Sequence, residues 1–282
     1  MAIELNNNIY TDGGNDTETT PVVLVHGFPV DHRMWDECAA ALRDQAVKPF
    51  AIWAPDMPGA GEGPIPSDED SGGKDADGAF PYGLDRMADA YVDLLHAAGY
   101  SKAIWVGLSM GGYLILDIQR LHPEAVAALA LCDTKADADS AGMRLKRVAI
   151  ATDCETTGTH EPVMGFAVPS EADSTVKQSD AYCRQFETWI NEQPAVGIAW
   201  RERMAAGRPD LNDVLPNINV PVAVICGDKD PSSPPAVMKP VADAMTKTDV
   251  TMTVIDDCGH FSAYEHPDQV AAALLELVKR VG

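Results

Sequence analysis

The stretch Trp105-Val106-Gly107-Leu108-Ser109-Met110-Gly111-Gly112 decides how the rest of the sequence is interpreted. An apolar, β-prone run over residues 103–106 leads into Gly-x-Ser-x-Gly, and a helix-like stretch follows over residues 113–121. A strand, a tight turn and a helix in this order expose one serine hydroxyl, and the strained turn needs nearly side-chain-free positions two residues before and after the serine. Gly107 and Gly111 meet that need. The pattern alone arises by chance in about one chain in ten of this length, so the flanking strand and helix carry the inference that Ser109 is a nucleophile.

Short apolar runs typical of buried strands recur along the chain and alternate with helix-like sequence. The expected strands cover residues 3–10, 21–25, 50–54, 103–106, 126–131, 220–226 and 250–255. Strands that alternate with helices and are apolar on both faces form a mainly parallel sheet with helices on each side. The sequence therefore predicts an α/β fold.

Residues 134–217 differ from the rest of the chain, because strand signals disappear there and helical spacing dominates. We predict a core formed by residues 1–133 and 218–282 and a helical cap formed by residues 134–217, at the carboxyl ends of the strands. The cap holds 13 acids and 9 bases, so it is close to neutral within a chain of net charge −22. Residues 62–80, rich in Gly, Ser, Pro and Asp, are expected to form a mobile, solvated loop.

Composition excludes several classes of partner. The net charge of −22 argues against nucleic acid, whose phosphates such a surface repels. No apolar run reaches the roughly 18–20 residues that a membrane span needs, and the start of the chain lacks the features of a signal peptide, so we expect a cytoplasmic protein. The six cysteines contain no Cys-x-x-Cys pair and no zinc-like histidine spacing, which favours free thiols and no metal site.

A serine nucleophile needs a base, and seven histidines compete for that role. In an architecture of this kind the chain order is serine, acid, histidine. His260 follows the expected strand 250–255 and a short loop, so it projects near Ser109 at the carboxyl edge of the sheet and is predicted to be the base. His266 begins the last helix, and His26 is expected to support the oxyanion loop. The others end helices or lie in polar loops.

The acid that orients the base is predicted to be Asp230. Asp228 and Asp230 both follow the expected strand 220–226, and Asp230 is better placed to curl towards His260. The alternative is that either aspartate only forms a turn in this loop, as aspartates often do. Asp133, at the end of the preceding strand, is a more distant alternative.

The tetrahedral intermediate needs two backbone N–H donors. Met110 supplies one, because it follows the nucleophile at the start of a helix. The second is expected from the turn after residue 25, with the Phe28 N–H as the favoured donor.

These residues, in this order, resemble the α/β-hydrolases, and in particular the branch of small esterases, 3-oxoadipate enol-lactonases and C–C bond hydrolases. The matching blocks are His26-Gly27-Phe28-Pro29, Asp56-Met57-Pro58-Gly59-Ala60-Gly61, Gly107-Leu108-Ser109-Met110-Gly111-Gly112, Gly227-Asp228-Lys229-Asp230, and Gly259-His260 with Glu265-His266-Pro267. The resemblance implies an eight-stranded sheet with the cap after the sixth strand, no cofactor, and Ser109, Asp230 and His260 as the catalytic residues. A serine at position 109 disfavours the relatives that use an aspartate nucleophile, haloalkane dehalogenases and epoxide hydrolases.

The expected function is hydrolysis of a carboxylic ester of small or medium acyl size through an acyl-enzyme. An enol-lactonase-like lactonase or a C–C bond hydrolase is the alternative within this chemistry. A ligand-binding protein without turnover on the same fold is an alternative from another class.

Two sets of cap residues are candidates for contact with the substrate. The acyl pocket is expected to involve Phe166, Trp189, Trp200 and Met204, although packing inside the cap explains the same side chains equally well. An anionic lactone would be favoured by a positive patch built from the cap arginines Arg144, Arg147, Arg184, Arg201 and Arg203.

Overall fold

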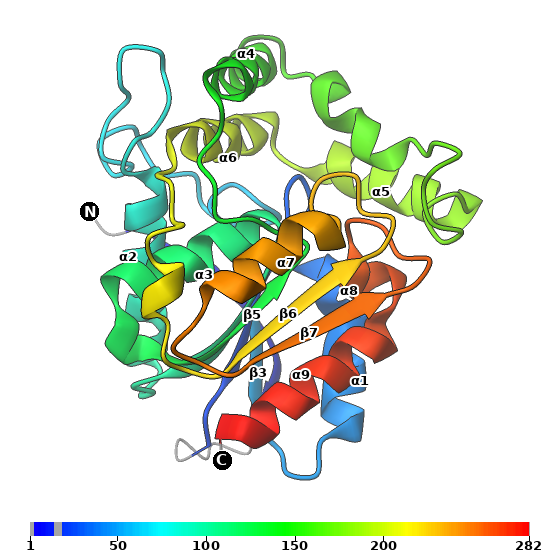
Figure 1. Cartoon of the computed structure of the whole chain (residues 1–282). Helices are drawn as coiled ribbons and strands as arrows, with labels where there is room; N and C mark the ends of the chain where they lie inside the picture. Colours follow the sequence, from blue (N-terminus) through cyan, green and yellow to red (C-terminus); the bar gives the residue numbers. More distant parts are fainter. Residues whose placement is uncertain (1–2, 14–18, 282) are drawn as a thin grey trace.

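The sheet at the centre of the molecule has seven strands (Figure 1). This computed structural model describes residues 3–13 and 19–281. The strands are β1 (Asn6–Asp12), β2 (Val22–Val25), β3 (Ala51–Asp56), β4 (Ala103–Leu108), β5 (Val126–Cys132), β6 (Val222–Gly227) and β7 (Val250–Ile255). Their order is β1-β3-β2-β4-β5-β6-β7, and among the described strands β1 alone runs antiparallel to its neighbour. The predicted α/β class with a mainly parallel sheet is confirmed.

The number of strands differs from the eight that the resemblance implied. The described residues form seven, which is the number that the apolar runs predicted. β1 already lies at the sheet edge, paired with β3, and residues 3–5 before it form no strand. The helical insertion consequently follows the fifth strand of this sheet, not the sixth.

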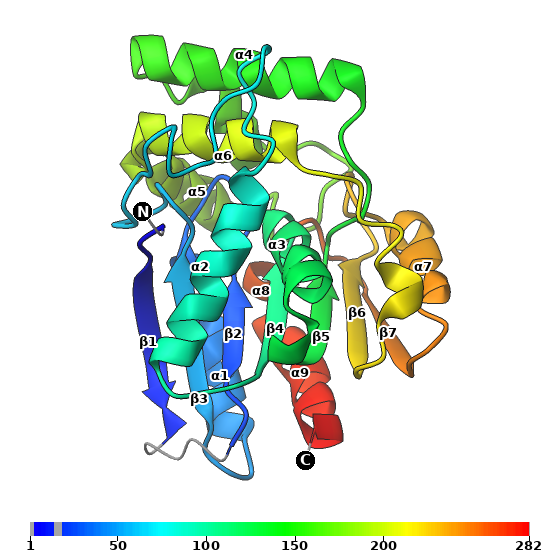
Figure 2. The ribbon, with the colours of Figure 1, turned by 90° about the vertical axis from the view of Figure 1, so that its left-hand side faces the viewer.

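Helices cover both faces of the sheet because each has one apolar side. In Figure 2, α2 (Gly83–Ala97) and α3 (Met110–Leu121) lie in front of the strands, and α1 (Asp36–Gln45) and α9 (Pro267–Val281) lie behind them. The remaining core elements are η2 (His32–Trp35), η3 (Pro123–Ala125), α7 (Pro235–Ala244) and α8 (Ser262–Glu265). No helix in the described part of the chain combines the length and the apolar character needed to cross a membrane.

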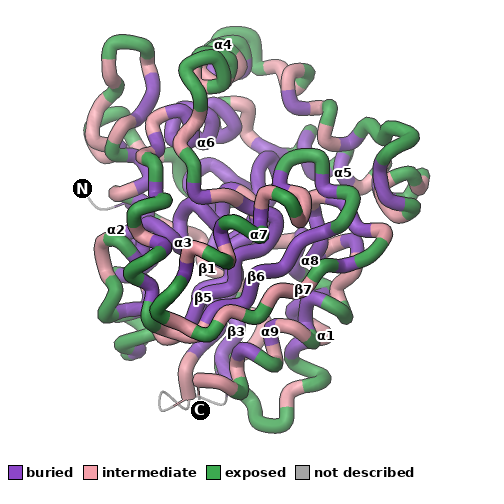
Figure 3. The backbone as a smooth tube through the Cα atoms, viewed as in Figure 1, coloured by how far each residue is buried: buried purple, intermediate pink, exposed green. Residues whose placement is uncertain are grey.

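The chain between β5 and β6 forms a helical layer above the carboxyl ends of the strands (Figures 1 and 2). Its elements are α4 (Ala141–Thr157), η4 (Glu161–Ala167), α5 (Asp180–Glu192), α6 (Ala195–Gly207) and η5 (Leu215–Asn217). Figure 3 shows β5 and β6 in the middle of the sheet buried and α4 largely exposed on the outside of this layer. α6 lies between α4 and the core, and its residues 197–206 are all buried. The layer therefore has an inner and an outer helix.

The start of α6 rests directly on the loop that follows β3. A Cβ atom added to Gly197 would lie 1.9 Å from the carbonyl oxygen of Gly59, so the two backbones touch. Side chains reinforce the contact, since Gln193 Oε1 accepts from the Gly61 N–H at 3.1 Å and the buried Arg201 guanidinium donates to the Val30 carbonyl at 2.9 Å. This point fixes the inner helix to the core.

Residues 62–80 are not the free, solvated loop that their composition predicted. The Arg144 guanidinium on α4 binds the carboxylates of both Asp75 and Asp77. The Trp200 Nε1–H on α6 donates to Ser71 Oγ at 2.8 Å, and Arg203 donates to a carbonyl of the same loop. The loop is thus a strap that joins the core to the helical layer.

Candidate active site

Ser109 lies in a strained turn between β4 and α3. Its φ of 56° falls in a region that residues other than glycine seldom adopt. A Cβ on Gly107 would lie 2.3 Å from the Gly111 carbonyl oxygen, and one on Gly111 would lie 2.3 Å from the Val25 carbonyl oxygen. Both contacts are with backbone that cannot give way, so the two glycines are required for the turn. Ser109 is partly buried at the tip of the turn and lines a pocket.

The sheet brings the ends of β4, β6 and β7 to one edge, and the three predicted catalytic residues meet there. The Ser109 hydroxyl lies 2.8 Å from His260 Nε2. His260 Nδ1 lies 2.9 Å from Asp230 Oδ2. With Nδ1–H donating to the carboxylate, Nε2 is left as an acceptor for the serine proton. The arrangement has the connectivity of a serine, histidine and aspartate triad.

The environment of the histidine sets its protonation. Burial lowers the pKa of His260, but the charge and hydrogen bond of Asp230 outweigh burial and hold the pKa above its ordinary value of 6.5. Burial likewise raises the pKa of Asp230, and His260 together with the Ser233 hydroxyl and the Ser232 N–H bring it below its usual 3.8. Asp230 is therefore an ionised carboxylate, fixed by hydrogen bonds from Ser232 and Ser233 at 2.8 and 2.7 Å.

The two alternative acids do not contact His260. Asp228 is exposed and its carboxylate accepts from the Cys258 N–H at 3.2 Å. Asp133 is fully buried, and it accepts from the N–H groups of Gly227 and Ser262 at 3.0 and 3.3 Å. Burial, added to by the neighbouring Asp230 carboxylate, raises the pKa of Asp133 to about 8. Asp133 thus ties together the backbone that carries Asp230 and His260.

The loop expected to supply the second oxyanion donor is held by His26. Its Nδ1 lies 2.9 Å from the Gly27 carbonyl, and its Nε2 accepts from the Met57 N–H at 2.9 Å. Burial lowers the pKa of His26 to about 4, so the ring is neutral and one nitrogen donates while the other accepts. Phe28 and Met110, the two predicted backbone donors, both line the pocket that contains Ser109.

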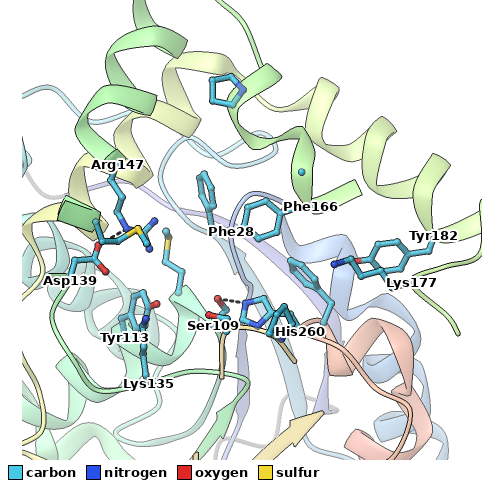
Figure 4. Close-up of a pocket in the computed structure, with 17 residues that line it drawn as sticks. Phe28, Ser109, Tyr113, Lys135, Asp139, Arg147, Phe166, Lys177, Tyr182 and His260 are labelled. Atoms are coloured by element: carbon cyan, nitrogen blue, oxygen red, sulfur yellow. Dashed lines mark hydrogen bonds and ion pairs between the residues drawn. The ribbon is translucent and has the colours of Figure 1, made fainter. Parts of the chain in front are cut away.

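This pocket has a volume of about 360 Å³ and lies between the sheet edge and the helical layer (Figure 4). Sheet-edge loops contribute Ser109 and His260, and the helical layer contributes Phe166 from η4 and Arg147 from α4. The Phe166 ring packs edge-on against Phe28, with ring centroids 6.0 Å apart. The walls are therefore apolar near Phe166 and mixed elsewhere, where Met110 and Met143 line the pocket together with charged side chains.

Of the four side chains expected in the acyl pocket, Phe166 alone lines it. Trp189 packs in an aromatic cluster with Tyr264 on α8, Trp200 is bonded to the strap, and Met204 packs against Gly83 at the start of α2. These three side chains pack between the layer and the core, whereas the alternative explanation of their pattern was packing inside the cap.

The expected arginine patch is also not assembled at the pocket. Arg147 lines it, but its guanidinium binds Asp139 and Glu202 at 2.5 and 2.6 Å. The other four lie elsewhere: Arg144 and Arg203 bind the strap, Arg201 is buried against backbone carbonyls, and Arg184 is exposed on α5.

Several polar lining residues were missed by the sequence analysis, among them Lys135, Lys177 and Tyr182. Lys135 lies three residues beyond Cys132, the last residue of β5, and its position after a strand end was a detectable signal. Lys177 lies in the turn before α5 and Tyr182 lies in the first turn of α5. Nothing in their local sequence identifies them as pocket residues. The Tyr182 hydroxyl is buried and has no hydrogen-bond partner among the described residues.

One cluster outside the pocket has the composition of a metal site. One ligand atom from each of Asp31, His32 and Asp56 falls within 4.8 Å of the others. Their lone pairs are already engaged, since Asp56 Oδ1 accepts from the His32 N–H at 3.0 Å and the Asp31 carboxylate binds Arg33 at 2.7 Å. The cluster is accounted for by hydrogen bonds that join the loops after β2 and β3.

Comparisons with known proteins agree with this fold. A model of the alpha/beta hydrolase family matches residues 22–273, and the chain belongs to that family. A thermophilic esterase from Thermogutta terrifontis is similar in structure, with 29% identity, a TM-score of 0.82, and coverage of 99% of this chain and 94% of that one. The enol-lactonase from Burkholderia xenovorans LB400 shares the fold at 22% identity and a TM-score of 0.79, covering 98% of this chain and 97% of that one.

A relative among the curated proteins is longer than this chain. It is the dihydrolipoyllysine-residue acetyltransferase component of the acetoin cleaving system of Pseudomonas putida, 26% identical over 264 residues. The match covers 93% of this chain but 64% of that relative, so this chain spans under two thirds of its length.

Proposed function

We propose that this protein is a serine hydrolase that cleaves a carboxylic ester through an acyl-enzyme. The observation that carries the proposal is the unbroken contact from the Ser109 hydroxyl to His260, at 2.8 Å, and from His260 to Asp230, at 2.9 Å. The similarity to an esterase from Thermogutta terrifontis supports the ester as substrate.

The proposed reaction uses the protein's own groups and water. His260 Nε2 accepts the Ser109 proton while Oγ bonds to the ester carbonyl carbon, and the N–H groups of Phe28 and Met110 stabilise the oxyanion. His260 then gives its proton to the leaving alcohol oxygen as the C–O bond breaks. Water attacks the acyl-enzyme with His260 again as base, which releases the acid and restores Ser109.

In this proposal the core is residues 1–133 and 218–282, and residues 134–217 are a cap over the catalytic edge. Phe166 is the cap side chain that contacts the acyl group, because it faces the same pocket as Ser109. The substrate is a small molecule, in keeping with a pocket of about 360 Å³.

The test is hydrolysis of p-nitrophenyl butyrate by the wild type and by Ser109→Ala. We expect kcat/KM to fall at least about a thousandfold, with an unchanged thermal melting curve. Ser101→Ala, at an exposed serine just before β4, is the matched control and should keep wild-type turnover. Turnover retained by Ser109→Ala contradicts the proposal.

Two further outcomes separate the alternatives. One equivalent of nitrophenol released without repeated turnover identifies a ligand-binding protein. A panel of simple esters, lactones and vinylogous diketones, each checked with Ser109→Ala, separates an esterase from a lactonase or a C–C bond hydrolase by the class that gives the highest kcat/KM.

A further inference from the structure

The pocket has two polar ends on opposite sides of the reactive serine. Figure 4 shows Ser109 in the middle, with Tyr113 and Lys135 on one side and His260, Lys177 and Tyr182 on the other. All of these residues line the same pocket. The two ends therefore contact different parts of any substrate that lies across Ser109.

At the end of the pocket beyond His260, the charge of Lys177 is neutralised by a carboxylate. Lys177 Nζ binds Asp173 Oδ1 at 2.8 Å, and both side chains are largely buried. This ion pair leaves Lys177 compensated, so this end of the pocket has, among its described residues, no unpaired charge to offer a substrate.

The Lys135 end is different because its lysine is not paired with a carboxylate among the described residues, whereas the arginines beside it are. Asp139 is shared between Arg147 at 2.5 Å and Arg208 at 2.8 Å, and Glu202 also binds Arg147. Within the described residues, Lys135 makes no hydrogen bond or ion pair, although it lines the pocket and is half-buried.

The guanidinium of Arg208 reinforces this asymmetry. It lies 4.1 Å from the centroid of the Tyr113 ring, which forms the wall next to Lys135 (Figure 4). In the part of the chain that the structure describes, Lys135 is thus an unpaired cation lining a pocket of a chain whose net charge is −22. A half-enclosed positive site on an acidic protein attracts an anion that the rest of the surface repels.

The chemistry of the proposed reaction says which part of the substrate reaches Lys135. His260 must hand its proton to the leaving oxygen, so the alcohol part lies on the His260 side of Ser109. The acyl chain then extends to the opposite side, where Tyr113 and Lys135 lie.

We propose that Lys135 binds a carboxylate carried by the acyl chain, so that the preferred substrate is a half-ester of a dicarboxylic acid. This inference rests on the proposed function and names the substrate class for it. The aliphatic part of the chain packs along Tyr113, and the Lys135 ammonium forms a charge-assisted hydrogen bond with the terminal carboxylate.

The experiment compares three esters of matched length. Monomethyl adipate has its carboxylate on the acyl side, methyl heptanoate is the neutral analogue, and 6-acetoxyhexanoate has its carboxylate on the alcohol side. We expect wild-type kcat/KM to be about tenfold higher for monomethyl adipate than for the neutral ester, and the preference should shrink as salt rises.

The variant Lys135→Met should remove this preference, measured as the ratio of kcat/KM for monomethyl adipate to kcat/KM for methyl heptanoate. Lys146→Met, at an exposed lysine on α4 that does not line the pocket, removes the same charge and should keep the preference. No preference in the wild type, or one that survives Lys135→Met, overturns the inference. A Lys135-dependent preference for 6-acetoxyhexanoate overturns the assignment to the acyl side.

Failure of the proposed function is distinguishable from failure of this inference. If the three esters are not hydrolysed, binding of monomethyl adipate is measured by calorimetry in Ser109→Ala with and without Lys135→Met. Weaker binding on loss of Lys135 supports the anion site without the esterase, and equal binding rules the site out.

Discussion

The two walls of the pocket are held in place by different forces. Ser109 and Asp230 follow β4 and β6, whose residues are buried along their whole length. The facing wall comes from η4 and α4, and α4 buries only Ala151 and Cys154. Charged contacts hold α4, above all those of Arg144 with the strap of residues 62–80 and of Arg147 with Asp139.

The predicted catalytic residues and the facing wall of the pocket are therefore expected to respond differently to salt. Burial of apolar strands is insensitive to salt, whereas ion pairs near the surface weaken as salt rises. The catalytic edge is therefore expected to keep its geometry under conditions that loosen the helical layer. Changes at the edge should alter kcat, and changes in the layer should alter KM, selectivity and the response to salt.

The largest effect is expected from Asp230→Asn at the catalytic edge. The variant loses the carboxylate that orients and stabilises His260, so kcat should fall about a thousandfold or more with little change in KM. Asp228→Asn removes an exposed carboxylate two residues earlier on the same loop and should retain near-wild-type kcat. Equal losses in the two variants would contradict the assignment of Asp230.

The pH dependence of kcat/KM is expected to be set by His260 at the sheet edge and not by residues of the helical layer. His260 must be neutral to act as base, so kcat/KM is lost as pH falls through its pKa, which lies above 6.5. The acidic limb, measured between pH 5 and 9, should have its midpoint above 6.5 in the wild type. The midpoint should move down in Asp230→Asn, since the charge that stabilises the imidazolium is gone, and stay unchanged in Phe166→Ala.

A smaller effect, and one on KM, is expected from Phe166→Ala in the layer. The change removes apolar wall from the pocket, so KM for a butyrate or hexanoate ester should rise about tenfold while kcat stays within a few-fold of wild type. Val168→Ala, at a side chain that is 63% exposed, is the control and should leave both constants unchanged. A fall in kcat without a change in KM would contradict the assignment of Phe166 to substrate binding.

The smallest effect is expected from Arg144→Met, which releases the strap from α4. The free energy of unfolding should fall by about 1 kcal/mol at low salt, and the difference from wild type should shrink in 1 M NaCl. Arg184→Met removes an exposed arginine of α5 whose nearest carboxylate oxygen lies 3.7 Å away, and should change little. A difference that persists unchanged at high salt would show that Arg144 acts through packing instead.

The sequence predicted the strands and the residues that meet at their carboxyl ends better than the side-chain contacts of the helical layer. The apolar runs gave the seven strands, and the order of Ser109, Asp230 and His260 along the chain sufficed because parallel strands end at one edge. Trp200 and Met204 were misplaced since α6 is buried on all sides, so its periodicity does not indicate which side chains face the pocket. The strap was misjudged because composition does not reveal that distant arginines bind it.

The touching backbones of Gly59 and Gly197 have a mechanical consequence. Because no side chain separates the start of α6 from the loop after β3, the two cannot move closer together. We therefore expect the helical layer to pivot about this point. α4 buries only two side chains and is tied to the strap by the charged contacts of Arg144, so we expect any widening of the entrance to occur at α4, away from the two glycines.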